Sequence, residues 1–223
     1  MTVVELSNSK GIYEILHFST NNGLVGILAK GLLQSRALLP KDEYLENVLH
    51  VNAKYRPEES LSFDKSEDWL NFVNLSVSEI NRRFFEFSES WHKQTEIWWA
   101  ILSFDTEILG HQGVYFTTTN NTYEYCRRAK GTVGFEAMFD EVVERKQNYS
   151  GVWKVNRATR LPNLTTCEQA EVLYPSALPV TYLRKVYVKE RNHHDAVLGW
   201  LRQFDLRRVV VEINPDKFIG KKN

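Results

Sequence analysis

The chain has 223 residues with 28 basic and 28 acidic side chains, so its formal net charge is zero. Hydrophobic residues make up 43% and charged residues 25%, which excludes the disordered, collagen-like and disulfide-scaffold classes of protein. A chain of this length can bury a sizeable core without a metal or a disulfide. Zero net charge also excludes a uniformly basic nucleic-acid binder.

The neutral total hides an uneven distribution of charge along the chain. Residues 1–120 carry ten basic and sixteen acidic side chains, a net charge of −6, whereas residues 121–223 carry eighteen and twelve, a net charge of +6. Such a split either directs one face of the protein toward a polyanion or disappears when the two halves mix on folding.

The N-terminal residues and the two cysteines bear on location. The first residues lack a basic region followed by an apolar stretch, and no apolar run approaches the roughly 20 residues that span a bilayer. Cys126 and Cys167 are isolated, which indicates a reducing compartment and no zinc cluster, although their spacing does not exclude one disulfide. We therefore expect a cytoplasmic protein with no metal and no membrane contact.

The chain opens with a strand, a polar turn and a helix. Residues 12–18 are short and apolar, which favours a buried strand. Residues 21–33 place leucine and isoleucine at helical spacing. We expect Asn21 or Asn22 to cap this helix and Gly31 to end it.

The middle of the chain alternates apolar runs with polar stretches. Residues 40–68 are acidic and without clear periodicity, which predicts a long surface connection. Aromatic and β-branched residues predict strands at 69–77, 96–104 and 113–120, with a helical stretch at 81–93 between the first two.

The second half of the chain mixes helices and strands without regular βαβ alternation. We predict an amphipathic helix at 133–145, a polar connection at 147–168, strands within 170–174 and 178–188, a helix at 193–206 and a last strand at 208–213. The chain contains no repeat and no obvious linker, so we predict a single α+β domain over residues 1–223.

Several common catalytic motifs are absent from the chain. It contains no GxxxxGK[ST], GxGxxG, HExxH or GxSxG, which argues against ATP-driven, Rossmann-type and zinc-protease chemistry. The adjacent residues His193 and His194 lack further metal ligands nearby in sequence, so a solvated helix start explains them better than a metal site.

Three places in the sequence are better candidates for chemistry. Residues 17–23 lie between a strand and a helix, where backbone amides can hold a ribose or a phosphate; a plain capped turn has the same pattern. Glu171 begins an apolar strand, where a carboxylate can act as a base or stabilise charge, although a solvated strand-edge glutamate also fits. Arg56, within the acidic connection, is by itself an ordinary surface arginine.

Together these pieces resemble the DarT family of DNA ADP-ribosyltransferase toxins from DarTG toxin–antitoxin systems. The resemblance is carried by LHFSTNNGLVGILAKGLL (16–33), Arg56 sixteen residues before Phe72, FVNLSV (72–77) and QAEVLYP (169–175). The segments RKVYV and RVVV near the end also look like closing strands of the family.

The resemblance implies the ADP-ribosyltransferase fold related to poly-ADP-ribose polymerases, with a split central antiparallel β core and surrounding helices. It implies transfer of ADP-ribose from NAD to a nucleobase in single-stranded DNA, with release of nicotinamide. Glu171 falls on the family's catalytic glutamate and Arg56 on its functional arginine, which also serves NAD. The loop at about 149–168 matches the substrate-recognition loop. The other residues that the resemblance assigns to NAD are His17, Phe18, Ser19, Asn22 and Gly26.

One departure from the family pattern concerns the choice of base. Where many relatives have an aromatic-rich YVPFYF-like strand, this chain reads FVNLSV, and Ser76 occupies the position of an aromatic residue. Relatives modify thymine or guanine, and the variant strand leads us to favour guanine.

Binding of a single DNA strand requires a cationic groove and aromatic platforms, because the target base must be unpaired. Any one of the candidate residues could also be a solvated surface side chain. The candidates for nucleic-acid contact are Arg82, Arg83, Tyr149, Trp153, Lys154, Arg157 and Arg160.

Alternatives to this function stay open from sequence alone. The same core pattern would serve an ADP-ribosyltransferase that acts on RNA or protein, or a non-catalytic nucleic-acid-binding module of the same fold. The resemblance also implies a cognate antitoxin with ADP-ribosyl hydrolase activity, of the macrodomain type or related to it. We expect the protein itself to be a monomer.

Overall fold

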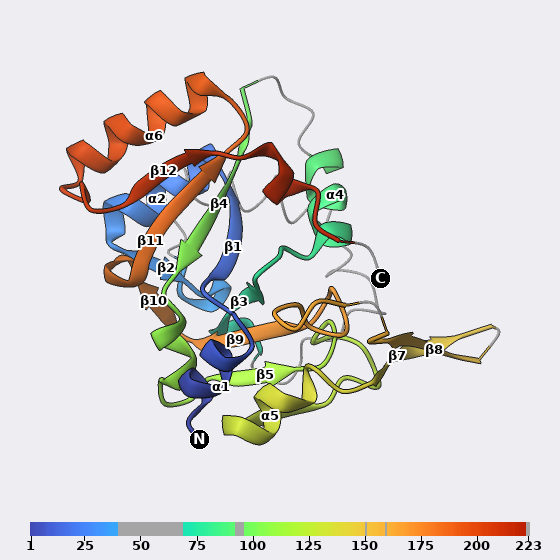
Figure 1. Cartoon of the computed structure of the whole chain (residues 1–223). Helices are drawn as coiled ribbons and strands as arrows, with labels where there is room; N and C mark the ends of the chain where they lie inside the picture. The colour runs from blue at the N-terminus through green and yellow to red at the C-terminus, as the bar shows by residue number, and fades with distance from the viewer. Residues whose placement is uncertain (40–68, 92–95, 150, 159, 222–223) are drawn as a thin grey trace.

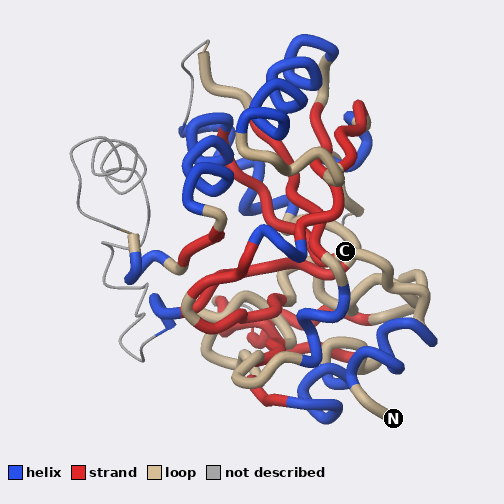
Figure 2. Tube along the Cα trace, turned by 90° about the vertical axis from the view of Figure 1, so that its left-hand side faces the viewer, coloured by secondary structure: helices blue, strands red, loops and turns tan. Residues whose placement is uncertain are grey.

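The computed structural model describes residues 1–39, 69–91, 96–149, 151–158 and 160–221. Its centre is an eight-stranded sheet with the strand order β12-β11-β4-β1-β3-β9-β5-β6. Only β11 and β12 pair in parallel, and the other neighbours are antiparallel. Helices lie around the strands (Figures 1 and 2). The predicted α+β class is confirmed.

The large sheet consists of two halves of four strands. One half contains β1 (Ile15–Thr20), β4 (Trp99–Phe104), β11 (Leu183–Val188) and β12 (Val210–Ile213). The other contains β3 (Phe72–Val77), β9 (Glu171–Pro175), β5 (Tyr115–Thr117) and β6 (Arg128–Lys130).

The remaining strands form two short ladders, and five α-helices are described. One ladder pairs β2 (Leu32–Gln34) with β10 (Ala177–Pro179), and the other pairs β7 (Val142–Asn148) with β8 (Gly151–Asn156). The helices are α1 (Val3–Ser9), α2 (Asn21–Lys30), α4 (Arg82–Trp91), α5 (Gly131–Ala137) and α6 (Arg191–Gln203).

The two halves of the sheet are joined by very little backbone pairing. β1 pairs with β3 only at Ile15↔Val77 and Leu16↔Ser76, whereas it pairs with β4 along all six of its residues. Beyond Leu16 the two strands separate, and in Figure 1 β1 and β4 run in a different direction from β9 and β5. The split antiparallel core that the family resemblance implies is therefore present.

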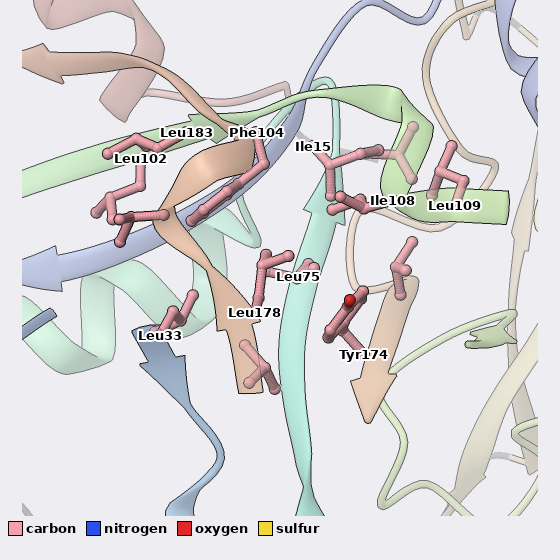
Figure 3. Packing of buried hydrophobic residues seen from close by; sticks show 14 of the residues in the cluster. Ile15, Leu33, Leu75, Leu102, Phe104, Ile108, Leu109, Tyr174, Leu178 and Leu183 are labelled. Atoms are coloured by element: carbon pink, nitrogen blue, oxygen red, sulfur yellow. The ribbon is translucent and has the colours of Figure 1, made fainter. Parts of the chain in front are cut away.

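The main core lies on one face of this sheet. Val73, Leu75 and Val77 alternate along β3 and are buried there, together with apolar residues of α2 and α6. Figure 3 shows Leu75 and Ile15 within this cluster. Because strand residues alternate between faces, the half-buried Asn74 and Ser76 of β3 lie on the opposite face.

Helix α4 covers part of that opposite face. Asn81 caps the helix, since its side chain accepts a hydrogen bond from the Phe84 N–H at 3.0 Å. Phe85 is buried and packs edge-on against Phe18 of β1 and Trp99 of β4, at centroid distances of 5.2 and 5.5 Å. This aromatic cluster holds α4 beside the point at which the sheet splits.

Helix α2 begins and ends almost where the sequence predicted. Its cap is Thr20, whose hydroxyl accepts from the Gly23 N–H at 3.2 Å, and not Asn21 or Asn22. Asn21 instead binds the chain before β4, because its backbone N–H donates to the Trp98 carbonyl at 2.8 Å. Gly31 ends the helix in the left-handed conformation, with φ of 69°, as predicted.

The predicted helix at 133–145 and the polar connection at 147–168 are wrong in part. Helix α5 ends at Ala137, and strands 142–148 and 151–156 pair as the β7–β8 hairpin, which projects from the body in Figure 1. Thr166 ties the reversal between them, since its N–H donates to the Met138 carbonyl and its hydroxyl to the Asp140 carbonyl. These long-range bonds end a run whose apolar spacing fits a helix and a strand equally well.

Other sequence expectations have mixed outcomes. Helix α1 and the short strands β2, β6 and β10 were not predicted, and residues 40–68 lie outside the described part of the chain. Both cysteines are free and buried. No helix within the described ranges is long and apolar enough to cross a membrane.

Candidate active site

Glu171 is held firmly at the first position of β9. Its backbone N–H donates to the hydroxyl of Thr117 on β5 at 3.0 Å, and the same hydroxyl lies 3.2 Å from the Glu171 carbonyl oxygen. Its carboxylate oxygen Oε2 accepts a hydrogen bond from the backbone N–H of Asn121 at 2.8 Å. Glu171 is therefore fixed both at its backbone and at its side-chain carboxylate, and the residue is half-buried.

His17 lies one residue beyond the last pair between β1 and β3. Its Nδ1 lies 3.0 Å from the backbone carbonyl oxygen of Asn74. Since a carbonyl can only accept, Nδ1 carries a proton in this contact. The imidazole thus bridges the two strands where their backbones separate.

β3 lies between the strands that carry His17 and Glu171. The β3–β9 register begins at Leu75↔Val172, so one further step places Ser76 beside Glu171. Ser76 also pairs with Leu16, the residue before His17. Two strand spacings of about 4.8 Å therefore put the Leu16 and Glu171 backbones roughly 10 Å apart, and His17 is the next residue along β1.

The start of α2 adds small and polar groups next to this point. Ser19 lies close against Gly23, where a Cβ atom would collide with its hydroxyl. A Cβ on Gly26 would meet no atom of the described residues within 4 Å, so their packing does not require glycine there. The open space over Gly26 and the half-buried amide of Asn22 fit a ligand that passes along the helix. The ring of Phe18, in contrast, is packed against Phe85 and Trp99.

A pocket of about 450 Å³ lies between α4 and the β7–β8 hairpin. The Trp153 ring in its wall carries two cations, with the Arg83 and Arg145 guanidinium carbons 5.5 and 4.6 Å from the ring centroid. Arg82 contributes a buried Nε atom that has no hydrogen-bond partner in the described structure. Glu168, three residues before Glu171, also lines the pocket. The predicted contacts Arg82, Arg83 and Trp153 are thus brought together.

Arg145 is a pocket residue that the sequence analysis missed. It occupies an irregularity in the β7–β8 register between Glu144 and Lys146, where a bulge re-aims a side chain. Its side chain is 1% exposed, and its Nε donates to the Cys167 Sγ at 3.1 Å. We predicted a helix over this segment, and a helix does not bring Arg145 next to Trp153. Only the pairing of β7 with β8 places the two side chains together.

Arg157 and Arg160 are turned inward. Arg160 forms a buried ion pair with Glu79 and donates to the Thr165 and Lys221 carbonyls. Arg157 donates to the carbonyls of residues 161, 162 and 164, and to the Thr166 hydroxyl. Both guanidinium groups therefore hold the loop before Glu171 from within and do not face a surface groove.

Three other predicted residues stand apart from this pocket. Lys154 pairs with Glu144 at 2.6 Å and lines a different hollow, as expected for the neighbour of Trp153 along a strand. Tyr149 is fully exposed at the tip of the hairpin. Arg56 lies outside the described residues, so its place in the site stays a prediction.

Burial also raises the pKa of the Glu79 carboxyl, while the Arg160 guanidinium beside it opposes the rise. The described part of the chain contains no group of three or more His, Cys, Asp or Glu side chains able to hold a metal ion.

Comparison with known proteins places the chain in a defined group. A family model described as "DarT: ssDNA thymidine ADP-ribosyltransferase" matches residues 16–219. No curated protein sequence matches the chain.

Solved structures with the same fold are distant in sequence. The chain is similar to Thermus sp. 2.9 DarT in complex with carba-NAD+, with a TM-score of 0.60, 16% identity and coverage of 92% of this chain and 97% of that one. For the same Thermus protein in complex with ADP-ribosylated ssDNA, the TM-score is 0.59 and the sequence identity 17%. That match covers 92% of this chain and 95% of the other. For Thermosipho africanus DarTG in complex with ADP-ribose, the TM-score is 0.57 and the sequence identity 15%. The match covers 93% of this chain but only 51% of the length of that one.

We predict that Arg160→Gln lowers the free energy of unfolding by about 3–5 kcal/mol, because it leaves Glu79 buried without its cation. The matched control is Arg83→Gln, which removes an exposed guanidinium from a ring face and should change stability by less than about 1 kcal/mol. Urea denaturation followed by circular dichroism measures both. Equal stability of the two variants would show that the buried pair does not hold the loop.

Proposed function

The chain belongs to the DarT family of single-stranded DNA ADP-ribosyltransferases, and on that premise we propose that it transfers ADP-ribose from NAD to a nucleobase in single-stranded DNA. The observation that carries the proposal is the position of His17 and Glu171 on the two strands that flank β3, at the split of the sheet. A fold alone would not carry it, because one fold supports many activities.

NAD supplies an ADP-ribosyl group whose C1′ gains positive charge as the bond to nicotinamide breaks, as in glycoside cleavage. Glu171 stabilises that charge, since its carboxylate is already oriented by Thr117 and Asn121 and needs no rearrangement. A nitrogen of the base then forms the new bond to C1′, and Glu171 accepts the proton that this nitrogen loses.

The residues proposed to hold NAD surround the start of α2. His17 presents Nε2 toward a ribose hydroxyl, because its Nδ1 is bonded to the Asn74 carbonyl. Ser19, Asn22 and the open surface over Gly26 line the way along the helix. Phe18 contributes its backbone, since its ring is packed in the aromatic cluster, and Arg56 is retained as a proposed contact.

The pocket beside Trp153 is proposed to bind the acceptor strand. It combines an aromatic ring with the cations Arg82 and Arg83, which suits stacking of a base next to a phosphate, while the buried Arg145 supports the ring from within. Tyr149 at the hairpin tip is retained as a second proposed ring. We remove Arg157 and Arg160 from the proposed contacts, because their guanidinium groups are bonded internally, and Lys154, because it lines a different hollow and pairs with Glu144.

Guanine and thymine are the two candidate target bases, and the assay described below distinguishes them. Our preference for guanine rests on Ser76, whereas the family description names thymidine. RNA and protein acceptors are separate outcomes of the same assay, as is a non-catalytic module. We also propose a cognate antitoxin with ADP-ribosyl hydrolase activity, of the macrodomain type or related to it. A monomeric, cytoplasmic protein stays our prediction.

We predict that Glu171→Gln lowers the rate of ADP-ribose transfer by about 100-fold or more, because the amide cannot offset the charge at C1′. The assay uses labelled NAD with single-stranded DNA, single-stranded RNA and a protein, and oligonucleotides that contain one thymine or one guanine. The exposed Glu124→Gln serves as the control and should retain full activity.

Transfer at the normal rate by Glu171→Gln would overturn the role of this residue. Label that appears only on RNA or protein would replace the acceptor class, and no NAD-dependent label with any acceptor would indicate a binding module.

We predict that Gly26→Ala raises the KM for NAD about tenfold or more while it stabilises the fold by up to about 1 kcal/mol. The added methyl improves helix propensity and meets no atom within 4 Å in the part of the chain that the structure describes, but it occupies the space proposed for NAD. Gly199→Ala in α6 is the matched control, since its Cβ also meets no described atom within 4 Å. An unchanged KM in Gly26→Ala would place NAD elsewhere.

We predict that Trp153→Ala weakens single-stranded DNA binding by about 1–3 kcal/mol, the contribution of one stacked base. Arg83→Gln should also reduce the salt dependence of binding, because one phosphate contact is lost. Fluorescence anisotropy of a labelled oligonucleotide at several salt concentrations measures both effects. Lys154→Gln, next to Trp153 but on the opposite face, is the control, and equal effects of all three variants would reject the pocket.

A further inference from the structure

Arg128 is bonded to the segment that holds the Glu171 carboxylate. It begins β6, and its Nε donates to the Asn121 side-chain oxygen at 2.5 Å. Its Nη2 donates to the Asn121 backbone carbonyl and its Nη1 to the Cys126 carbonyl at 3.2 Å. One planar guanidinium therefore binds three oxygens of a single loop, a geometry that lysine cannot reproduce.

The sheet register places Arg128 and Glu171 on the same face. Thr117 of β5 pairs with Glu171 on one side and with Arg128 on the other. Residues directly opposite each other in a sheet point to the same face. Asn121, which is buried, fills the space between them, since it accepts from Arg128 and donates its N–H to Glu171.

Arg128 and the Glu171 carboxylate are bonded to the same residue, Asn121. No carboxylate in the described part of the chain pairs with Arg128, which lies 5.4 Å from the Trp69 ring centroid. Burial raises the pKa of the Cys126 thiol to about 11, and the charges of Arg128 and Glu171 act on that thiol in opposite directions. Both charges therefore lie near one sulfur atom, which stays neutral at physiological pH.

We propose that Arg128 is a positioning residue for the transfer reaction: it fixes the loop at Asn121 so that the Asn121 N–H holds Glu171 Oε2. This inference rests on the proposed function of Glu171. It assigns Arg128 no contact with NAD or DNA. Of the described titratable groups near Glu171, His17 lies across β3, Cys126 is neutral, and Arg128 supplies the favourable charge.

The test compares Arg128→Gln with the wild-type chain over a pH range. We expect kcat to fall about 10- to 100-fold, the scale of a misplaced catalytic group, with the KM for NAD unchanged. The acid limb of the kcat–pH profile should move to higher pH, because both the cation and the Asn121 N–H favour the ionised carboxylate. Arg128→Lys keeps the positive charge but loses the planar guanidinium that binds three oxygens. Its acid limb should therefore lie near the wild-type position, while its kcat stays lowered.

Arg127→Gln is the matched control for this experiment. Arg127 is the neighbouring arginine, but its side chain is 60% exposed and pairs with Asp140, so neither kcat nor the acid limb should change. The fall in kcat in the double variant Asn121→Ala with Arg128→Gln should be smaller than the product of the two single-variant falls. The reason is that both substitutions act through the same contact.

Two results would overturn the proposal. One is an unchanged kcat and acid limb in Arg128→Gln. The other is a loss of kcat that follows a lowered melting temperature while the acid limb stays in place, which would show a purely structural role. If the wild-type chain and Glu171→Gln are equally inactive, the proposed function itself fails, and the role of Arg128 fails with it.

Discussion

The separation of β1 from β3 after Leu16 is the constraint on which the candidate site depends. Two backbone pairs join the halves of the sheet, and the next carbonyl along β3 that faces β1, that of Asn74, is taken by the His17 ring. A ladder continued by further residues would use that carbonyl and bring the strands within about 4.8 Å of each other. Because the pairing stops, the His17 side chain and not another backbone pair occupies the Asn74 carbonyl, on the strand that separates His17 from Glu171.

Several arginines of this chain are bonded within the protein, and the cations around Trp153 lie together in one pocket. Arg128, Arg157 and Arg160 satisfy loop carbonyls or a buried carboxylate, so much of the positive charge of the second half is structural. The cations that surround Trp153 remain in one pocket. The proposed contact with single-stranded DNA is therefore local, and a local contact does not require a net positive charge on the whole chain.

How far sequence reasoning reached can be followed through particular residues. The opening strand, helix α2 and its end at Gly31 were predicted, because local apolar spacing and a left-handed glycine define them. The β7–β8 hairpin was missed, since its strands are held by cross-strand pairing and by bonds from Thr166, which lie outside any local window. With the hairpin the sequence analysis also missed Arg145, whose meaning depends on facing Trp153.

The sequence by itself determined the fold class, the family and the identity of the candidate groups, because these follow from short motifs such as the segment around His17 and the one around Glu171. Only the tertiary structure decided which arginines line a pocket and which are buried in ion pairs. Arg83 and Arg160 have the same chemistry, yet one lies over an aromatic ring in a pocket and the other is buried against Glu79. The difference arises from the long-range packing of the loop before β9, where burying a charge requires a paired opposite charge.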